Sequence, residues 1–268
     1  MRKVFAFIKR DFCIDISYRF SFAFQVAWVL LSTSCYYFLA RFMGPGMQTG
    51  GMEQYGGNYF AFILIGVALN DYHTTSLSVF SRSIRESQLA GTLEALLTTQ
   101  TSLSTVILSS AVYPFLWSCM RVVLYLVFGA WIFHLPLGTG NWAAAILVLL
   151  LSIVVFSCFG VLSAAFILMF KRTSPIPLVL EALAWLLGGI LYPVTVLPDW
   201  LKRVSSLLPI TYSIEGLRAS LLGEPSWSRV WPSLGPLLLL AALLLPVSLL
   251  CFSYATRRAR IWGTLAQY

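Results

Sequence analysis

The sequence has few charged residues. Asp, Glu, Lys and Arg make up 10% of the 268 residues, whereas hydrophobic residues make up 59%, and the mean hydropathy is +0.82. Soluble domains carry about 25% charged residues, so this composition excludes a water-soluble globular protein. The long apolar run 143–170 also excludes a membrane β-barrel, whose short strands alternate apolar and polar residues. The composition therefore predicts an all-α polytopic membrane protein, with residues 1–268 as one transmembrane domain.

The sequence also lacks the motifs of several enzyme classes. None of its four lysines follows a glycine, so it has no G-x-x-x-x-G-K-[ST] motif for binding ATP phosphates. Its five cysteines are scattered without a C-x-x-C pair, its two histidines are far apart, and it has no G-x-S-x-G motif. We therefore expect no enzyme activity, cofactor or metal in this chain. If ATP drives its function, ATP and Mg²⁺ must bind to a separate ATPase subunit.

Six apolar runs predict six membrane-spanning helices. They cover residues 20–42, 59–80, 104–133, 142–170, 176–192 and 234–255. Before them, residues 1–18 predict an amphipathic helix at the membrane interface. Lys9, Arg10 and Asp11 interrupt its apolar residues and no cleavage site follows, so we do not expect a signal peptide here.

Residues 199–222 are amphipathic but do not resemble a further span. Each charge at the centre of a membrane helix costs about 2.5–3.5 kcal/mol, and after Asp199 this segment carries four more charged side chains: Lys202, Arg203, Glu215 and Arg218. Pro209 divides the segment into two apolar stripes. We therefore predict a re-entrant hairpin of two short helices that enters the outer leaflet and returns.

The basic residues predict the orientation. With six spans, twelve of the 18 lysines and arginines lie on one side, five on the other, and Arg121 lies within a span. The positive-inside rule then puts both termini in the cytosol, and the expected location is the cytoplasmic (inner) membrane. This distribution also explains the net charge of +8 without a nucleic-acid partner.

Ionisable residues inside spans are costly and are candidates for function. Asp71, Arg121 and Glu181 lie in the second, third and fifth predicted spans. Asp71 and Arg121 either form a buried pair that fixes the helix register, or line a translocation path with Glu181 and contact the substrate. A metal site of Asp71 and His73 is disfavoured, because positions i and i+2 face different sides of a helix.

The most extended polar segment in the first two thirds of the chain is 82–99. Leu89, Leu93, Leu96 and Leu97 form one apolar stripe, which predicts a helix along the cytosolic membrane surface. A loop helix that only joins two spans is the alternative. The segment resembles the cytosolic coupling helix of permease subunits of ATP-binding-cassette (ABC) type-2 exporters, in which R-E-x-Q-x-x-G-T-L-E-x-L-L recurs. The matching residues are Arg85, Glu86, Gln88, Gly91, Thr92, Leu93, Glu94, Leu96 and Leu97.

Residues 188–218 resemble the fifth span and the external hairpin of the same family. The residues that carry this resemblance, and that it implies for an outer gate, are Tyr192, Pro193, Pro198, Trp200, Pro209, Thr211, Tyr212, Glu215 and Arg218. The resemblance implies a permease subunit of an ATP-driven exporter. Two copies, as a homodimer or a heterodimer, would form the path, and a nucleotide-binding ATPase subunit would bind the coupling helix.

The substrate class stays open among drug-like, lipid-linked and polysaccharide molecules. Two other functions also stay open. One is an ion-coupled carrier or channel that uses Asp71, Arg121 and Glu181. The other is an intramembrane glycan or lipid transferase, which would need a cluster of acids and histidines near one leaflet.

Overall fold

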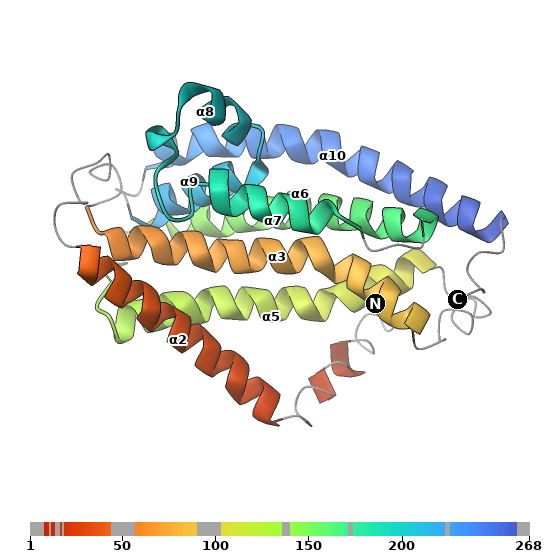
Figure 1. Cartoon of the computed structure of the whole chain (residues 1–268), viewed down its shortest axis with the longest axis horizontal. Coiled ribbons are helices and arrows are strands. Elements are labelled where there is room, and N and C mark those ends of the chain that lie inside the picture. Colours follow the sequence, from red (N-terminus) through yellow and green to blue (C-terminus); the bar gives the residue numbers. More distant parts are fainter. Residues whose placement is uncertain are drawn as a thin grey trace.

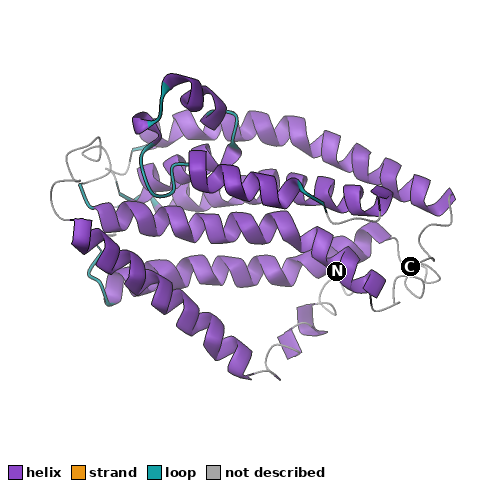
Figure 2. Cartoon of the chain, in the orientation of Figure 1, coloured by secondary structure: helices purple, strands orange, loops and turns teal. Residues whose placement is uncertain are grey.

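The computed structural model describes residues 8–10, 12–13, 17, 19–43, 57–89, 103–135, 140–170, 174–222 and 226–261. Within these ranges the regular structure is helical (Figures 1 and 2). In chain order the elements are α2 (Arg19–Met43), α3 (Tyr59–Leu89), α5 (Leu103–Trp131), α6 (Trp142–Phe170), α7 (Ile176–Leu187), the 3₁₀ turn η3 (Val194–Val196), α8 (Asp199–Ser205), α9 (Pro209–Leu221) and α10 (Trp227–Ile261).

Helix α3 is the centre of the bundle. The long helices α3, α5, α6 and α10 run along the long axis of the molecule, and α2 crosses them obliquely (Figure 1). α3 contacts α2, α5, α6, α7 and α9, and every residue from 59 to 70 is buried. The main hydrophobic core therefore forms around the first half of α3, between α5, α6, α9 and α10.

The outer surface of the bundle is apolar. Phe20, Phe42 and Trp131 are each more than four-fifths exposed, although their side chains are large and hydrophobic. Such a surface is unfavourable in water and fits the hydrocarbon of a bilayer, in which a helix satisfies its own backbone hydrogen bonds. The sequence-based expectation of an all-helical membrane protein is confirmed by this architecture.

Four of the described helices are long and apolar enough to cross a membrane. Their apolar parts are Phe22–Met43, Leu108–Trp131, Trp142–Phe170 and Trp227–Arg258. α3 is 31 residues long but contains polar residues such as Asn70 and Asp71, and α7 is too short to be counted with them. Whether α3 and α7 also cross the membrane, as the predicted total of six spans requires, stays a prediction.

The fifth predicted span, 176–192, differs from the structure. α7 ends at Leu187, so it has 12 residues and a length of about 18 Å, whereas the hydrocarbon layer is about 30 Å thick. Gly188 caps the helix and Gly189 has a φ of +73°, a left-handed conformation that turns the chain. Leu191 and Tyr192 therefore lie in the connection to η3.

Two other predicted segments can be compared with the described residues. The predicted hairpin 199–222 contains the two short helices α8 and α9, separated near Pro209. The second predicted span, 59–80, continues without interruption to Leu89, so the start of the predicted coupling helix belongs to α3. Most of the predicted interfacial helix 1–18 lies outside the described residues. In Figure 1, α8 and α9 lie at one end of the bundle, and the C-terminal end of α3 lies at the opposite end.

A glycine sets the distance between α6 and α3. A Cβ atom at Gly160 of α6 would lie 2.5 Å from the Ser76 carbonyl oxygen and 2.8 Å from the Phe80 ring. The small residue therefore lets the two backbones approach closely, as small residues do between membrane helices.

We expect Gly160→Ala to destabilise the protein, because α6 and α3 would have to separate, at a cost of about 1–3 kcal/mol. Gly235→Ala in α10 is the matched control, since a Cβ there meets no atom within 4 Å. Both glycine-to-alanine changes favour the helical backbone by about 1 kcal/mol. The difference in stability between the two variants therefore isolates the effect of packing. Thermal unfolding in detergent, followed by size-exclusion chromatography, measures it, and equal melting temperatures would contradict the close packing.

Candidate functional site

A buried arginine joins three elements at the hairpin end of the bundle. Arg218 of α9 is 1% exposed. Its Nε donates to the Phe62 carbonyl oxygen at 3.1 Å and its Nη2 to the same oxygen at 2.8 Å. Nη1 donates to the Gly189 oxygen at 2.8 Å, and Nη2 also donates to the Ile190 oxygen at 3.0 Å. The planar guanidinium, with its five donors, thus links α9 to α3 and to the chain after α7. We call this arrangement the Arg218 joint.

Glycines on both partners make the Arg218 joint possible. Because the chain turns at Gly189, the carbonyls of Gly189 and Ile190 leave the helical pattern and point at the guanidinium. On α3, a Cβ at Gly66 would lie 2.7 Å from the Ile190 oxygen and 2.8 Å from Nη2 of Arg218. Any larger residue at 66 would therefore push the two partners apart.

Hydroxyl groups fix the turn between α8 and α9. The Ser205 hydroxyl donates to the Leu187 carbonyl at 2.7 Å, so α8 is attached to the end of α7. The Thr211 hydroxyl donates to the Ser205 carbonyl at 3.0 Å, and the Tyr212 hydroxyl to the Ser206 carbonyl at 2.7 Å. Thr211 and Tyr212, two of the residues that carry the family resemblance, thus supply side-chain bonds that close this turn.

Two tyrosines hold the segment that follows α7. The Tyr59 hydroxyl at the start of α3 donates to the Leu191 carbonyl at 3.1 Å, and the Tyr192 hydroxyl donates to the Leu186 carbonyl. Pro193 is buried beside them. The tyrosine–proline pair at the end of the predicted fifth span therefore fixes a turn of the chain.

The remaining predicted hairpin residues are divided between surface and interior. Trp200 is 68% exposed and Pro198 is exposed, whereas Pro209 is buried. Glu215 is partly buried, and this burial raises the pKa of its carboxyl group, while the positive charge of Arg218 opposes the shift. Trp200 is thus available to lipid or to another chain, and Glu215 belongs to the surroundings of the Arg218 joint.

Arg218 is one of the five basic residues that the sequence-based count places on the external side, and the structure shows that its side chain is buried. Its side chain is in the core because it lies four residues after Ile214 and three before Leu221, on the apolar stripe of α9. That position is the signal that predicts its burial. Gly66 was missed for another reason: its neighbours come from α9 and from the chain after α7, and no local pattern records them.

A second polar centre lies in the middle of the bundle. Nη1 of Arg121 in α5 lies 3.1 Å from Oδ1 of Asp71 in α3, and Nη2 donates to the Thr75 hydroxyl at 2.8 Å. The side chains of Arg121 and Asp71 are 21% and 27% exposed. The structure thus brings together two of the three intramembrane ionisable residues, and this pair joins α3 to α5. Glu181 lies partly exposed on α7 and takes no part in these contacts.

Several buried polar atoms near this ion pair have no hydrogen-bond partner. Within the described residues, Asn70 Oδ1, His73 Nδ1 and Ser118 Oγ are buried and make no hydrogen bond. His73 instead packs edge-on against Phe156 of α6, with ring centroids 4.6 Å apart. These groups can bind water or a polar part of a ligand. No three His, Cys, Asp or Glu residues in the described ranges are close enough together to hold a metal ion.

The predicted coupling segment begins at the far end of α3. Arg82 and Glu86 are exposed and Arg85 is partly exposed, whereas Ile84 is buried. The three charged residues and the buried Ile84 give the last turns of α3 a polar face and an apolar face. The side chain of Gln88 and the residues Gly91, Thr92, Leu93 and Glu94 lie outside the described part of the chain.

We expect Arg218→Lys to destabilise the protein strongly, although it keeps the charge. A single ammonium group cannot reproduce the planar fork, and each buried carbonyl left without a partner costs about 1–3 kcal/mol. Arg203→Lys in α8 is the control, because Arg203 is exposed. Thermal unfolding of both variants in detergent tests this expectation. Equal melting temperatures would mean that the Arg218 joint does not hold the hairpin.

A double-mutant cycle of Asp71→Asn and Arg121→Gln should give a coupling energy of about 0.5–3 kcal/mol, because the two groups are in contact and partly buried. The exposed Asp199–Lys202 pair, at 3.1 Å, is the matched control, and we expect little coupling there. The four variants of each cycle are compared by thermal unfolding. Additive losses at Asp71 and Arg121 would contradict a structural pair.

The chain was also compared with known proteins. The model of the ABC-2 type transporter family matches residues 3–222. The inner membrane transport permease YadH of Escherichia coli K12 is 38% identical over 93 residues, which are 34% of this chain and 36% of the relative. The permeases of the same name from Escherichia coli O157:H7 and Shigella flexneri give the same values. The aligned part is thus about a third of the length of these relatives. Because the family model matches most of the chain, the chain belongs to the ABC-2 type transporter family.

Proposed function

We propose that this chain is the permease subunit of an ATP-driven exporter in the inner membrane. It is a membrane transport permease by family, and permeases of this family normally work with an ATP-binding subunit. The sequence has no P-loop of its own. In this proposal ATP and Mg²⁺ bind to that ATP-binding subunit and not to the residues of this sequence.

The observation that carries this proposal is the position of the two family motifs relative to α3. Arg82, Arg85 and Glu86, which belong to the described start of the polar segment, lie near one end of this helix, and the hairpin α8–α9 lies at the other (Figure 1). Residues 59–70, the part of α3 on the hairpin side, are buried. A continuous helix is a rigid element, so a displacement of its second half is passed on to its first half.

The Arg218 joint gives this displacement a route. Phe62 of α3 accepts two hydrogen bonds from Arg218, which also binds Gly189 and Ile190 beyond α7. ATP binding by the partner favours one arrangement of the bundle by its differential contacts with the end of α3. The movement then passes through Phe62 and Arg218 to α7 and α9, and the hairpin opens or closes the external side of the path.

The path itself lies between two copies of the chain, as a homodimer or a heterodimer. The apolar outer faces of the helices fit either lipid or a second copy. We further propose six spans and both termini in the cytosol, with α3 crossing beside the four long apolar helices and α7 crossing together with the chain that follows it. The substrate is a drug-like, lipid-linked or polysaccharide molecule.

An ion-coupled carrier is the alternative function, and the Asp71–Arg121 contact makes it weaker. Each charge is already compensated by the other, whereas a proton- or ion-binding carboxylate must exchange its partner during transport. The two functions differ in energy source. Reconstituted chain that transports with a proton gradient and without an ATPase would support the carrier and overturn the exporter.

We expect Gly91→Pro and Glu94→Lys to leave the permease in the membrane but to reduce its stimulation of the ATPase about fivefold or more, the lower range of coupling between sites. Both residues lie in the family motif of the coupling segment. The tagged chain is purified with the P-loop ATPase that accompanies it from native membranes, and ATP hydrolysis is measured with and without the permease.

Asp199→Lys is the matched charge control, because Asp199 lies on α8 at the other end of the bundle and is exposed. It should leave the stimulation unchanged. Full stimulation by the Gly91 and Glu94 variants, or recovery of the chain without any ATPase, would overturn the proposed coupling.

A further inference from the structure

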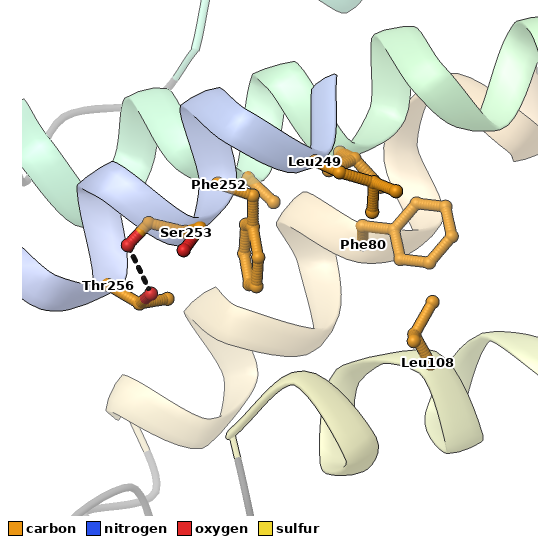
Figure 3. A pocket seen from close by; sticks show the side chains of 8 residues that line it. Phe80, Leu108, Leu249, Phe252, Ser253 and Thr256 are labelled. Carbon is orange, nitrogen blue, oxygen red and sulfur yellow. Dashed lines mark hydrogen bonds between the residues drawn. The ribbon is translucent and has the colours of Figure 1, made fainter. Parts of the chain in front are cut away.

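A cavity of about 260 Å³ lies between α3, α5, α6 and α10, near the ends of these helices that are remote from the hairpin. Figure 3 shows Phe80 of α3, Leu108 of α5, and Leu249 and Phe252 of α10 directed toward the same space. A dry apolar cavity of about 150 Å³ is large enough to bind benzene. This cavity therefore has room for a longer hydrocarbon segment.

The cavity is closed toward the bundle and open on its outer side. Phe80 and Phe252 are 3% and 7% exposed, whereas Leu108 and Leu249 are 53% and 52% exposed. Along α10, the apolar residues Leu249 and Phe252 are soon followed by the charged residues Arg257 and Arg258. The opening thus lies near the point where α10 leaves the hydrocarbon layer, beside the lipids of one leaflet.

The walls change from apolar to polar to charged along α10. Leu249 and Phe252 are followed by the hydroxyls of Ser253 and Thr256 on the rim of the cavity. The Thr256 hydroxyl donates to the Ser253 carbonyl, and Ser253 is exposed. Arg257 is also exposed and lies four residues after Ser253, on the same face of the helix.

The order of apolar, hydroxyl and arginine side chains matches the order of acyl chain, ester and phosphate in a phospholipid. An acyl chain fits the apolar walls, an ester carbonyl accepts a hydrogen bond from the Ser253 hydroxyl, and a phosphate binds an arginine. We propose that the cavity is a binding site for an anionic phospholipid of the leaflet in which α10 ends, with one acyl chain between Phe80 and Phe252 and the phosphate at Arg257. The site holds a resident lipid and lies apart from the Asp71–Arg121 centre.

Photolabelling tests the acyl-chain part of this proposal. The full chain is reconstituted into nanodiscs that contain phosphatidylglycerol with a diazirine in one acyl chain, and the labelled peptides are identified by mass spectrometry. We expect label on α6 and α10 beside the cavity. Val161→Phe fills the cavity and should reduce this label to background. Val154→Phe, two turns away on α6 and outside the cavity, should not reduce it.

The headgroup part is tested by comparing this probe with phosphatidylcholine that carries the same acyl chain. We expect stronger labelling by phosphatidylglycerol, and Arg257→Gln should reduce this preference about fivefold. Arg229→Gln, at the other end of α10, should leave it unchanged.

Equal labelling in Val161→Phe and Val154→Phe, or label spread evenly over the outer helices, would overturn the acyl-chain site. An unchanged lipid preference in Arg257→Gln would overturn the phosphate contact. The assay contains neither an ATPase nor a transport substrate, so its result is independent of the proposed exporter function.

Discussion

The structure depends on a guanidinium that cannot lose its charge and has no access to water. An arginine stays protonated even when it is buried, and a buried charge needs hydrogen-bond partners. Arg218 obtains them from the carbonyls of Phe62, Gly189 and Ile190. Several local features follow from this one requirement. α7 has to end early enough to free two carbonyls, and α3 needs a glycine at position 66 for the guanidinium to approach.

Two arginines that contact α3, Arg218 and Arg121, have their charge compensated in different ways. Arg218 is 1% exposed and is balanced by backbone dipoles from two elements, so its geometry is determined on all sides. Arg121 is partly exposed and is balanced by one carboxylate, while neighbouring Asn70 and His73 keep unused polar atoms. The first arrangement suits a permanent joint. The second leaves neighbouring polar atoms that can bind water or a polar ligand beside the intact ion pair.

The sequence predicted most of the helices and less of how they end. The bounds of α6 agree with the prediction, because a run of 29 residues with almost no polar side chain leaves no alternative in a bilayer. The two short helices of the hairpin also follow from their stripes and from Pro209. The early end of α7 was not predicted from the sequence, because it depends on a contact between Gly189 and Arg218, which are 29 residues apart in the chain. The Asp71–Arg121 contact stayed one of two alternatives, since depth in a span does not fix rotation about the helix axis.

α3 connects these features, and its packing limits how it can move. Its first half is enclosed by the main core, whereas its second half belongs to a separate small cluster that includes Phe80, Ile84, Ala164 and Phe252. Closely packed interiors resist deformation, so displacement of α3 relative to its neighbours is easiest in the second half. Phe80 is also a wall of the cavity at that end. Any shift of this part of α3 against α10 therefore changes the shape of the cavity, and a molecule bound there resists or favours the shift according to its fit.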